Sequence, residues 1–516
     1  MIVAFLAVFT GIWLVTMHVQ PENEVEAYKK FLIAKGEKLE ISEVLPSPVS
    51  PESNGVAVVR SAFALLISAS DDWTNLPSTM RMVAPGRAMV GWQQPDVRGY
   101  DFTNSWENVM AASAANGPAA ELLRQAALFP ALDFQLKYND GAFLMLPHLA
   151  PLKHSSQRLS AAAMCALHNG DAVSATTNLC VALALVQEMQ AERITISQLV
   201  RIAMASIVAS ASWELLQSTN VTDADLAALQ AGWERLEFIR ASGNTMLMDR
   251  AITEVTIKKL RASRAEFNRM TGLYGSIGMG GSSSSSSWTS SGDWFEDAKD
   301  LTKAGWDKTK LAGATFMWRV SWTYSDELHA LQGKQLVLES LRTIGTNQFF
   351  QPAYSNLDVQ LYKLGMTNSS GDLLVDFDDL NLRSMFSGSI GSMSATVRKT
   401  MAAETCRRVV ITAIALKRFQ LKHGTFPEKL SELMPEYVAA VPLDAVDGQP
   451  LRYRQNGDGT YLLYSVGEDG LDGGGDLTPA KTTTSSIWNW QRGRDWVWPQ
   501  PATSAEVQYF YEHPPK

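Results

Sequence analysis

The feature that most constrains the fold of this chain is an uncharged run at its N-terminus. Residues 2–17, IVAFLAVFTGIWLVTM, contain no Asp, Glu, Lys or Arg. With Met1, His18 and Val19 the run reaches residue 19. As a helix rising about 1.5 Å per residue, it is long enough to cross a bilayer. We therefore predict a single-pass transmembrane anchor over residues 1–19.

The flanks of this run favour an anchor over a cleaved signal peptide. A signal peptide begins with basic residues and ends at a small-residue motif such as A-x-A. Here no Lys or Arg precedes the run, and MHVQPENEVE follows it. The orientation is a separate question, because the positive-inside rule alone would place the body in the cytoplasm. The basic residues that follow the run are Lys29, Lys30, Lys35 and Lys38.

The chain as a whole has the composition of a folded protein with several domains. Its 516 residues are 46% hydrophobic and 19% charged, which excludes a disordered chain. The net charge of −8 argues against binding to nucleic acid, which requires a basic surface. The three cysteines cannot form a closed disulfide framework, and we expect them to be buried in apolar helices. They are Cys165, Cys180 and Cys406.

A helical pattern dominates the middle of the chain. We expect residues 20–104 to form a stalk and an irregular segment, and residues 105–399 to form a helical domain. In the stretch 158–190, apolar residues recur at intervals of three and four, which is the spacing of one helix face. Asn169-Gly170-Asp171 should end one helix and cap the next, so the sequence predicts a helical hairpin.

This hairpin resembles the middle of a tetratricopeptide repeat, in which small residues let paired helices pack closely. The residues that carry the resemblance are Gly170, Asp171, Ala175, Leu179 and Ala182. A repeat-like body is one expectation. Because the sequence shows no clear repeat period, an ordinary helical bundle is the alternative.

Two further segments of the helical domain have a distinctive composition. Residues 275–293 contain six consecutive serines flanked by glycine, and we expect a flexible loop, either within the domain or at a domain boundary. The stretch LLVDFDDLN carries an acidic cluster, which is expected to cap a helix because carboxylates suit helix N-termini. Its members are Asp376, Asp378 and Asp379.

Residues 400–516 change pattern from helix to strand. Glu404–His423 has its apolar residues on one helix face and ends at Gly424, a residue typical of helix ends. Leu451–Arg454 and Tyr461–Ser465 read as strands, and Asn456–Gly459 joins them as a hairpin turn. The predicted fold class is therefore mainly α, with an N-terminal transmembrane helix, a helical body and a small α+β C-terminal domain.

The order of motifs in this domain strongly resembles the globular part of the major pseudopilins of type II secretion. The matching segments are GTFP at 424–427, PLD at 442–444, GQPLRY at 448–453 and YSVGEDG at 464–470. The resemblance implies an antiparallel sheet packed on a helix and a calcium-binding loop. It departs from the family in two respects. The uncharged run lies far upstream of the helix and lacks the family's processing motif, and the C-terminal segment is longer and more aromatic than the family's ending. We therefore expect a pseudopilin-like domain that is attached to a helical body instead of to its own membrane helix.

The stretch YSVGEDGLDGGGD, residues 464–476, predicts a cation site. Calcium takes six to eight oxygens, and glycines let the backbone present its carbonyl groups. The crowded carboxylates of Asp469, Asp472 and Asp476 would repel one another without a cation. The family's loop closes on an Asp that is followed by an apolar residue further along the chain. The resemblance therefore adds Asp495, in Asp495-Trp496, as a fourth ligand. A solvated Asp-Gly turn without Ca²⁺ is the alternative.

The C-terminal segment is rich in tryptophan. Trp488, Trp490, Trp496 and Trp498 lie at alternating positions on the two sides of Arg492-Gly493-Arg494. This spacing predicts a terminal hairpin with one aromatic face. We expect that face to pack on the helical domain rather than to bind a ligand.

Motifs of catalysis are missing from the sequence. It contains no H-E-x-x-H, G-x-S-x-G, Walker loop or C-x-x-C. His148 and His154 lie close together around Pro151 and are candidates for ligands or general bases. A surface loop is the simpler interpretation of this segment.

Two functions remain from the sequence. The first is a non-enzymatic scaffold or binding protein, anchored in a bacterial inner membrane by residues 1–19, with its body in the periplasm and protein partners in a secretion or pilus-like assembly. Calcium implies that extracytoplasmic location, where the ion is abundant. The alternative is an extracytoplasmic hydrolase whose residues meet only in the fold. A deep pocket with two carboxylates or a His-carboxylate pair would favour the hydrolase.

Overall fold

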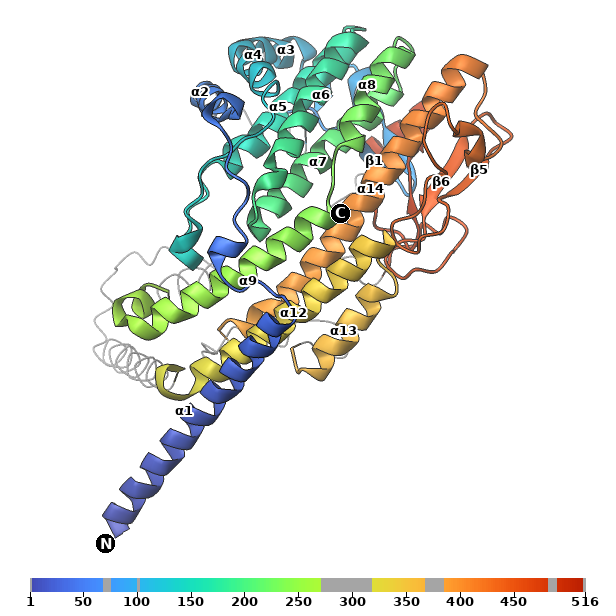
Figure 1. Ribbon diagram of the computed structural model, residues 1–516. Coiled ribbons are helices and arrows are strands. Elements are labelled where there is room, and N and C mark those ends of the chain that lie inside the picture. Colours follow the sequence, from blue (N-terminus) through green and yellow to red (C-terminus); the bar gives the residue numbers. More distant parts are fainter. Residues whose placement is uncertain are drawn as a thin grey trace, which may run out of the picture.

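The computed structural model describes residues 2–67, 76–99, 103–270, 318–366, 385–480 and 490–513. Within these ranges the chain is mainly helical, as the sequence predicts, with small sheets of which β5-β6-β7 lies in the C-terminal part (Figure 1). The predicted serine loop at 275–293 lies outside the described residues. The same is true of Trp488 and of the acidic cluster at 376–379.

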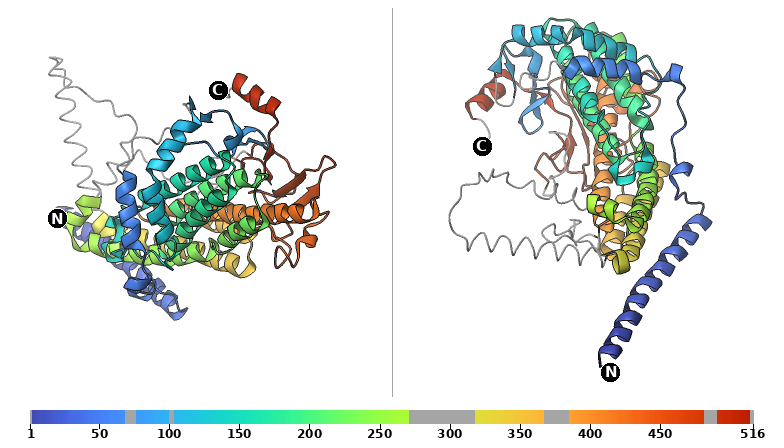
Figure 2. Two further views of the ribbon diagram at one scale, coloured as in Figure 1. Left: turned by 90° about the horizontal axis from the view of Figure 1, so that it is seen from above. Right: turned by 90° about the vertical axis from the view of Figure 1, so that its left-hand side faces the viewer.

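The first helix, α1 (Ile2–Ala34), contains the predicted anchor and continues well beyond it. It spans 33 residues and is therefore about 50 Å long. Its N-terminal end points away from the rest of the molecule (Figures 1 and 2). Its C-terminal half lies beside α12 (Thr323–Asn347). The segment predicted as a stalk thus begins within the same helix as the predicted anchor.

The body is a set of helices stacked around one extended core (Figure 1). The chain winds back and forth through α5, α6 and α7, and α7 then packs on α14. The helix α14 also contacts α8, α9 and α12. These helices are α5 (Leu149–His168), α6 (Ala172–Glu188), α7 (Thr195–Leu216), α8 (Asp223–Glu234), α9 (Ile239–Ala262) and α14 (Ile390–His423).

Shorter helices surround this stack. The helices α2, α3 and α4 gather against α5, and α13 packs on α12 and α14. Their bounds are α2 (Val56–Ile67), α3 (Trp106–Ala115), α4 (Gly117–Ala126), α13 (Ala353–Lys363) and, at the C-terminal end, α15 (Ser504–Glu512).

The predicted helical hairpin is confirmed. The helix α5 ends at His168, and Gly170 adopts a left-handed backbone with φ of 76°. Asp171 then caps α6, where its carboxylate accepts a hydrogen bond from the Ser174 amide at 2.9 Å. Ala175 and Ala182 are fully buried, and their small side chains let neighbouring helices approach closely.

Among the described helices, two are long and apolar enough to cross a membrane by length and composition. They are Ala172–Ala191, which contains α6, and α7. In each, 67% of the most apolar stretch is buried inside the molecule. Burial of this extent is a property of core helices, and both lie within the stack described above.

The C-terminal part contains the predicted helix and strand hairpin. The strands β5 (Arg452–Gln455) and β6 (Tyr461–Ser465) pair antiparallel, with Tyr453 opposite Leu463. The helix before them begins at Ile390 rather than at Glu404. Met393, Val397 and Met401 are buried four residues apart, so its apolar face extends N-terminally. The predicted domain boundary at 399/400 lies inside α14.

The predicted tryptophan hairpin does not form within the described residues. Trp496 lies in β7 (Trp496–Val497), which pairs antiparallel with β6 and gives the strand order β5-β6-β7. Gly493 pairs instead with Pro479. The edge of β6 that does not face β5 has unpaired backbone N–H and C=O groups. The tail forms hydrogen bonds with them as the third strand, β7.

The packing predicted for the tryptophans is confirmed for those that the structure describes. Trp490, Trp496 and Trp498 are all buried in the main core. The Trp213 indole on α7 donates a hydrogen bond to the Pro499 carbonyl at 2.9 Å. The tail is thereby fixed to the helical body.

The end of the chain returns to its beginning. A second sheet has the order β1-β2-β8 and joins β1 (Arg81–Ala84) and β2 (Arg87–Met89) to β8 (Gln500–Pro501), which runs parallel to β2. A third, two-stranded sheet consists of β3 (Val97–Arg98) and β4 (Thr103–Asn104). Short strands therefore occupy a segment that the sequence predicts as irregular.

Candidate functional sites

The acidic loop follows β6 and is shaped by glycine. Gly467, Gly470, Gly474 and Gly475 all adopt left-handed backbone, with φ between 68° and 92°. These conformations are costly for residues with a Cβ. At Gly467 a Cβ would also overlap the Arg494 carbonyl oxygen. The glycines of this stretch therefore let the loop fold back over residues 493–495.

Asp495 is the buried centre of this loop. Its side chain is fully buried, and its carboxylate accepts hydrogen bonds from the amides of Gly475 and Asp476, both at 2.7 Å. A third, longer bond of 3.3 Å comes from the Gly473 amide. The backbone of the loop thus turns its N–H groups toward Asp495, and these hydrogen bonds stabilise the negative charge of the carboxylate.

The other predicted ligands are held by separate partners. Asp472 accepts a hydrogen bond from the Tyr464 hydroxyl at 2.9 Å and lies 3.2 Å from the Arg452 Nε. Asp476 lies 3.6 Å from an Arg494 Nη. Asp469 is exposed and accepts a hydrogen bond from the Leu471 amide at 3.0 Å.

These bonds lower two pKa values in the loop. The Gly474 amide, followed by Tyr464 and Arg452, lowers the pKa of Asp472. The pKa of Asp476 is lowered mainly by hydrogen bonds from Thr478.

Two of the four predicted ligands meet. A Cβ placed on Gly473 would lie 2.8 Å from the Asp476 Cβ and 2.9 Å from the Asp495 Oδ2, so these side chains flank the same glycine. Asp472 and Asp469 take part in different contacts. In the part of the chain that the structure describes, no group of three or more His, Cys, Asp or Glu is placed to hold a metal. The expected repulsion is offset here by two arginines and by backbone amides.

Asp444 is a structural residue that the site prediction did not single out. It is fully buried and accepts hydrogen bonds from the Ser465 hydroxyl at 2.8 Å and from the amides of Val446 and Val466, both at 2.9 Å. Burial raises the pKa of this carboxyl. The aspartate of the PLD motif therefore ties the end of β6 to the segment before β5. The place of Asp444 in the PLD motif was the feature of the sequence from which its structural role could have been predicted.

A second candidate site contains His148. The histidine occupies the cap position of α5 and is buried, and His154 lies within the helix. The interpretation of this segment as a surface loop is wrong, because Leu149 and Leu152 are buried and draw the first turn of α5 into the core. Burial, together with Lys153 and Arg158, lowers the pKa of His154.

His148 pairs with a carboxylate that the sequence reasoning missed. Its Nε2 lies 2.7 Å from the Glu192 Oε1, and both side chains are about 95% buried. The contact is close but poorly aligned, since neither these two atoms nor the second Glu192 oxygen makes a hydrogen bond. The Phe134 ring stacks on the imidazole at 4.0 Å.

His148 also lines a pocket of about 650 Å³ between α2, residues 134–147 and the start of α5. A His-carboxylate pair at a pocket is the arrangement that would favour a hydrolase. The remaining lining residues are mostly apolar, and no Ser, Thr or Cys is among them.

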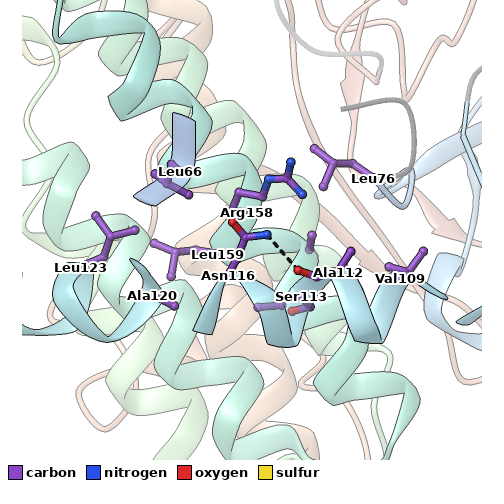
Figure 3. A pocket seen from close by; sticks show the side chains of 12 residues that line it. Leu66, Leu76, Val109, Ala112, Ser113, Asn116, Ala120, Leu123, Arg158 and Leu159 are labelled. Atoms are coloured by element: carbon purple, nitrogen blue, oxygen red, sulfur yellow. Dashed lines mark hydrogen bonds between the residues drawn. The ribbon is translucent and has the colours of Figure 1, made fainter. Parts of the chain in front are cut away.

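Two other cavities have different characters. A space of about 30 Å³ between α2, α3, α4 and α5 has room for about one water molecule, and Figure 3 shows Asn116 beside it, bonded to the Ala112 carbonyl. A cleft of about 630 Å³ lies between α9, α12 and α14. Two of its charges are already paired, since Arg407 lies 2.7 Å from Glu404.

Comparison of the chain with protein-family models, with curated proteins and with solved structures finds no match.

Proposed function

We propose that this protein is a membrane-anchored extracytoplasmic scaffold or binding protein with a pseudopilin-like C-terminal part. The observation that supports it most is the continuity of α1, which carries the uncharged run at one end and is locked into the body at the other. A helix held in this way fixes the orientation of the body relative to its anchor. Fixed orientation is what a scaffold requires.

Buried ion pairs provide the lock. The Lys29 Nζ lies 2.7 Å from the Glu254 carboxylate on α9 and also contacts Glu327 on α12. Both carboxylates are almost fully buried. Just after α1, Glu37 pairs with the fully buried Arg250 at 2.9 Å and with Arg342. Removing one partner of such a pair leaves an uncompensated buried charge.

The C-terminal part supports the pseudopilin-like element of the proposal. A long helix is followed by a strand hairpin, a glycine-rich acidic loop and a third antiparallel strand. Residues of the shared motifs carry this arrangement. Asp444 anchors the end of β6, and the Tyr453 hydroxyl donates a hydrogen bond to the Pro427 carbonyl at 2.6 Å.

The location can be tested by cysteine accessibility in a bacterial host. The three native cysteines are free and lie mostly within the core, so one cysteine introduced as Asp458→Cys in the exposed turn after β5 would be the reporter. We expect a membrane-impermeant maleimide to label it in intact spheroplasts, with the protein in the membrane fraction. Labelling that occurs only after lysis would contradict an extracytoplasmic body.

Calcium binding by the acidic loop is part of this proposal. Its support is the convergence of Asp476 and Asp495 on Gly473 and the resemblance of the loop. Calcium at a hundred times its dissociation constant would add about 2.7 kcal/mol of stability. We expect calcium, and not magnesium, to raise the melting temperature of the full chain.

Asp476→Asn tests this site, with Asp458→Asn in the exposed turn as its control. We expect the first variant to lose the calcium effect and the second to keep it. An unchanged melting temperature in wild type would remove calcium from the proposal and leave the scaffold.

The hydrolase is a second candidate, favoured by the His148-Glu192 pair beside its pocket. Its test is hydrolysis of a panel of nitrophenyl esters by wild type, His148→Ala and Glu192→Gln. Activity lost in both variants would support it. Equal rates in all three proteins would exclude this pair as a catalytic site.

A further inference from the structure

The pocket at His148 has the size and walls of a ligand site. Its volume of about 650 Å³ lies within the range of small-molecule pockets. Phe63 on α2 and Phe134 have parallel rings 6.5 Å apart, and His148 also stacks on Phe134, at 4.0 Å. Leu136, Leu144 and Met145 extend this surface. The result is an apolar trough suited to an aliphatic chain.

The charges on the pocket are unequal. Arg60 and Lys137 line it, and both are exposed. Within the described chain neither has an ion-pair partner, and Arg60 only approaches the Phe134 ring, at 6.0 Å. Asp140 is the one acidic residue among the lining residues. The balance favours an anion.

The start of α5 adds to this preference. His148 caps this 20-residue helix, and Pro147, His148 and Pro151 all line the pocket. The N-terminus of a helix carries a partial positive charge, which attracts carboxylates and phosphates. The helix end and the two basic side chains therefore surround the same space.

A buried polar group on the pocket wall sets this place apart from a packed core. The Nε2 of His148 and the carboxylate of Glu192 are buried, and they face each other at 2.7 Å without the alignment of a hydrogen bond. Buried polar atoms in proteins are nearly always hydrogen-bonded. His148 lines the pocket directly, so the wall there contains a buried polar pair and is not purely apolar.

We propose that this pocket binds an anionic amphiphile with one acidic group, namely an acyl chain that ends in a carboxylate. The chain lies on the surface of Phe63, Phe134 and Met145. The carboxylate lies near Arg60, Lys137 and the start of α5. A neutral head group would gain nothing from these charges, and a cationic one would be repelled.

The test is photolabelling of the full chain in nanodiscs of zwitterionic lipid, with a diazirine-bearing fatty acid as the probe. We expect the label to map by mass spectrometry to residues 134–147. Laurate should compete for it, whereas dodecyltrimethylammonium should not. Equal competition by the two amphiphiles, or a label spread over the whole chain, would overturn the proposal.

Variants separate the charge from the cavity. The double change Arg60→Gln and Lys137→Gln should lower labelling at least about tenfold, because each hydrogen bond to a charged group contributes appreciably to binding. Ala64→Trp fills the pocket from an exposed position of α2. It should abolish labelling although Arg60 and Lys137 are both retained. Arg240→Gln, in the cleft beside α9, is the matched control and should label as wild type. Labelling that persists in Ala64→Trp would contradict the site.

Discussion

At the scale of single residues, this chain is held together by buried charges with defined partners. Glu37 receives hydrogen bonds from Arg342, Gln335 and Arg250. Burial by itself would raise the pKa of Glu37, but these donors lower it to about 2. The ionised carboxylate is therefore part of the folded structure. Its contribution to stability is present above the normal pKa of about 4.5 and is lost as the pH falls toward 2.

Replacing Glu37 tests the importance of this pairing. Glu37→Ala leaves Arg250 buried and without its anion, and we expect the free energy of unfolding to fall by about 3 kcal/mol. Glu40→Ala is the matched control, because its pair with Lys258 is more than half exposed and contributes about 0–1 kcal/mol. Urea titration of both variants makes the comparison. An equal loss of unfolding free energy in the two variants would show that the buried pair of Glu37 and Arg250 adds no more stability than an exposed pair.

Glu214 on α7 predicts a pH dependence of the opposite sign. Burial raises the pKa of its carboxyl to about 8, although the amides of Met80 and Gly91 donate to it and oppose the rise. The folded chain keeps this proton where the unfolded chain has lost it, so stability should fall between about pH 4.5 and pH 8.

The measurement is the melting temperature of wild type and Glu214→Gln across that range. We expect the variant, which has no charge to bury, to lose less stability as the pH rises. Parallel curves for the two proteins would mean that Glu214 is already ionised in the folded state.

At the scale of elements, the acidic loop and the tail stabilise each other. The loop residues 473–476 close over Asp495, which directly precedes β7. The tail in turn adds the third strand to the β5-β6 hairpin. A two-stranded hairpin alone is marginally stable, so this closure explains why the small sheet persists against α14.

Asp495→Ala should therefore destabilise the protein even in the absence of a metal. It leaves partly buried amides without their acceptor, and an unsatisfied buried amide costs about 1–3 kcal/mol, so we expect a loss of about 3 kcal/mol in urea titrations with chelator present. Asp469→Ala, on an exposed turn of the same loop, should change stability by less than about 0.5 kcal/mol. An effect of Asp495→Ala seen only with calcium would instead assign Asp495 to a metal.

At the scale of the whole molecule, distant parts of the chain close on one another. The strand β8 pairs with β2, and Trp213 of the body holds the tail. The helix α1 is locked against α9 and α12 by Lys29, while its first half projects beyond the body (Figure 2). The predicted anchor segment and the locked half of α1 should therefore be separable parts of one rigid helix.

Two truncations test this arrangement. Removing residues 2–19 should leave the melting temperature of the body nearly unchanged, because the lock lies beyond them. Removing residues 2–38 also takes away Lys29 and Glu37, and should lower the melting temperature by about 6 °C or more, at about 2–4 °C per kcal/mol. Differential scanning fluorimetry of both proteins gives the answer. Equal melting temperatures would mean that the lock adds no stability.

Local sequence patterns predicted much of the fold. Asn169-Gly170-Asp171 marked a helix boundary because a left-handed glycine and an N-cap act within a few residues. The β5-β6 hairpin followed from alternation and a glycine turn for the same reason. The start of α14 was placed too late. Its earlier turns mix small polar residues with the buried Met393 and Val397, which weakens the apolar pattern.

The amino-acid sequence by itself determined the helical hairpin of α5 and α6 and the β5-β6 hairpin, since these depend on neighbours along the chain. Only the tertiary structure decided the partners. It paired β7 with β6, placed Glu192 beside His148, and turned Asp495 toward backbone amides while Asp472 faced Arg452. Each of these contacts joins residues that are distant in the sequence. Their energy depends on burial and on direction in space, and a local pattern contains neither.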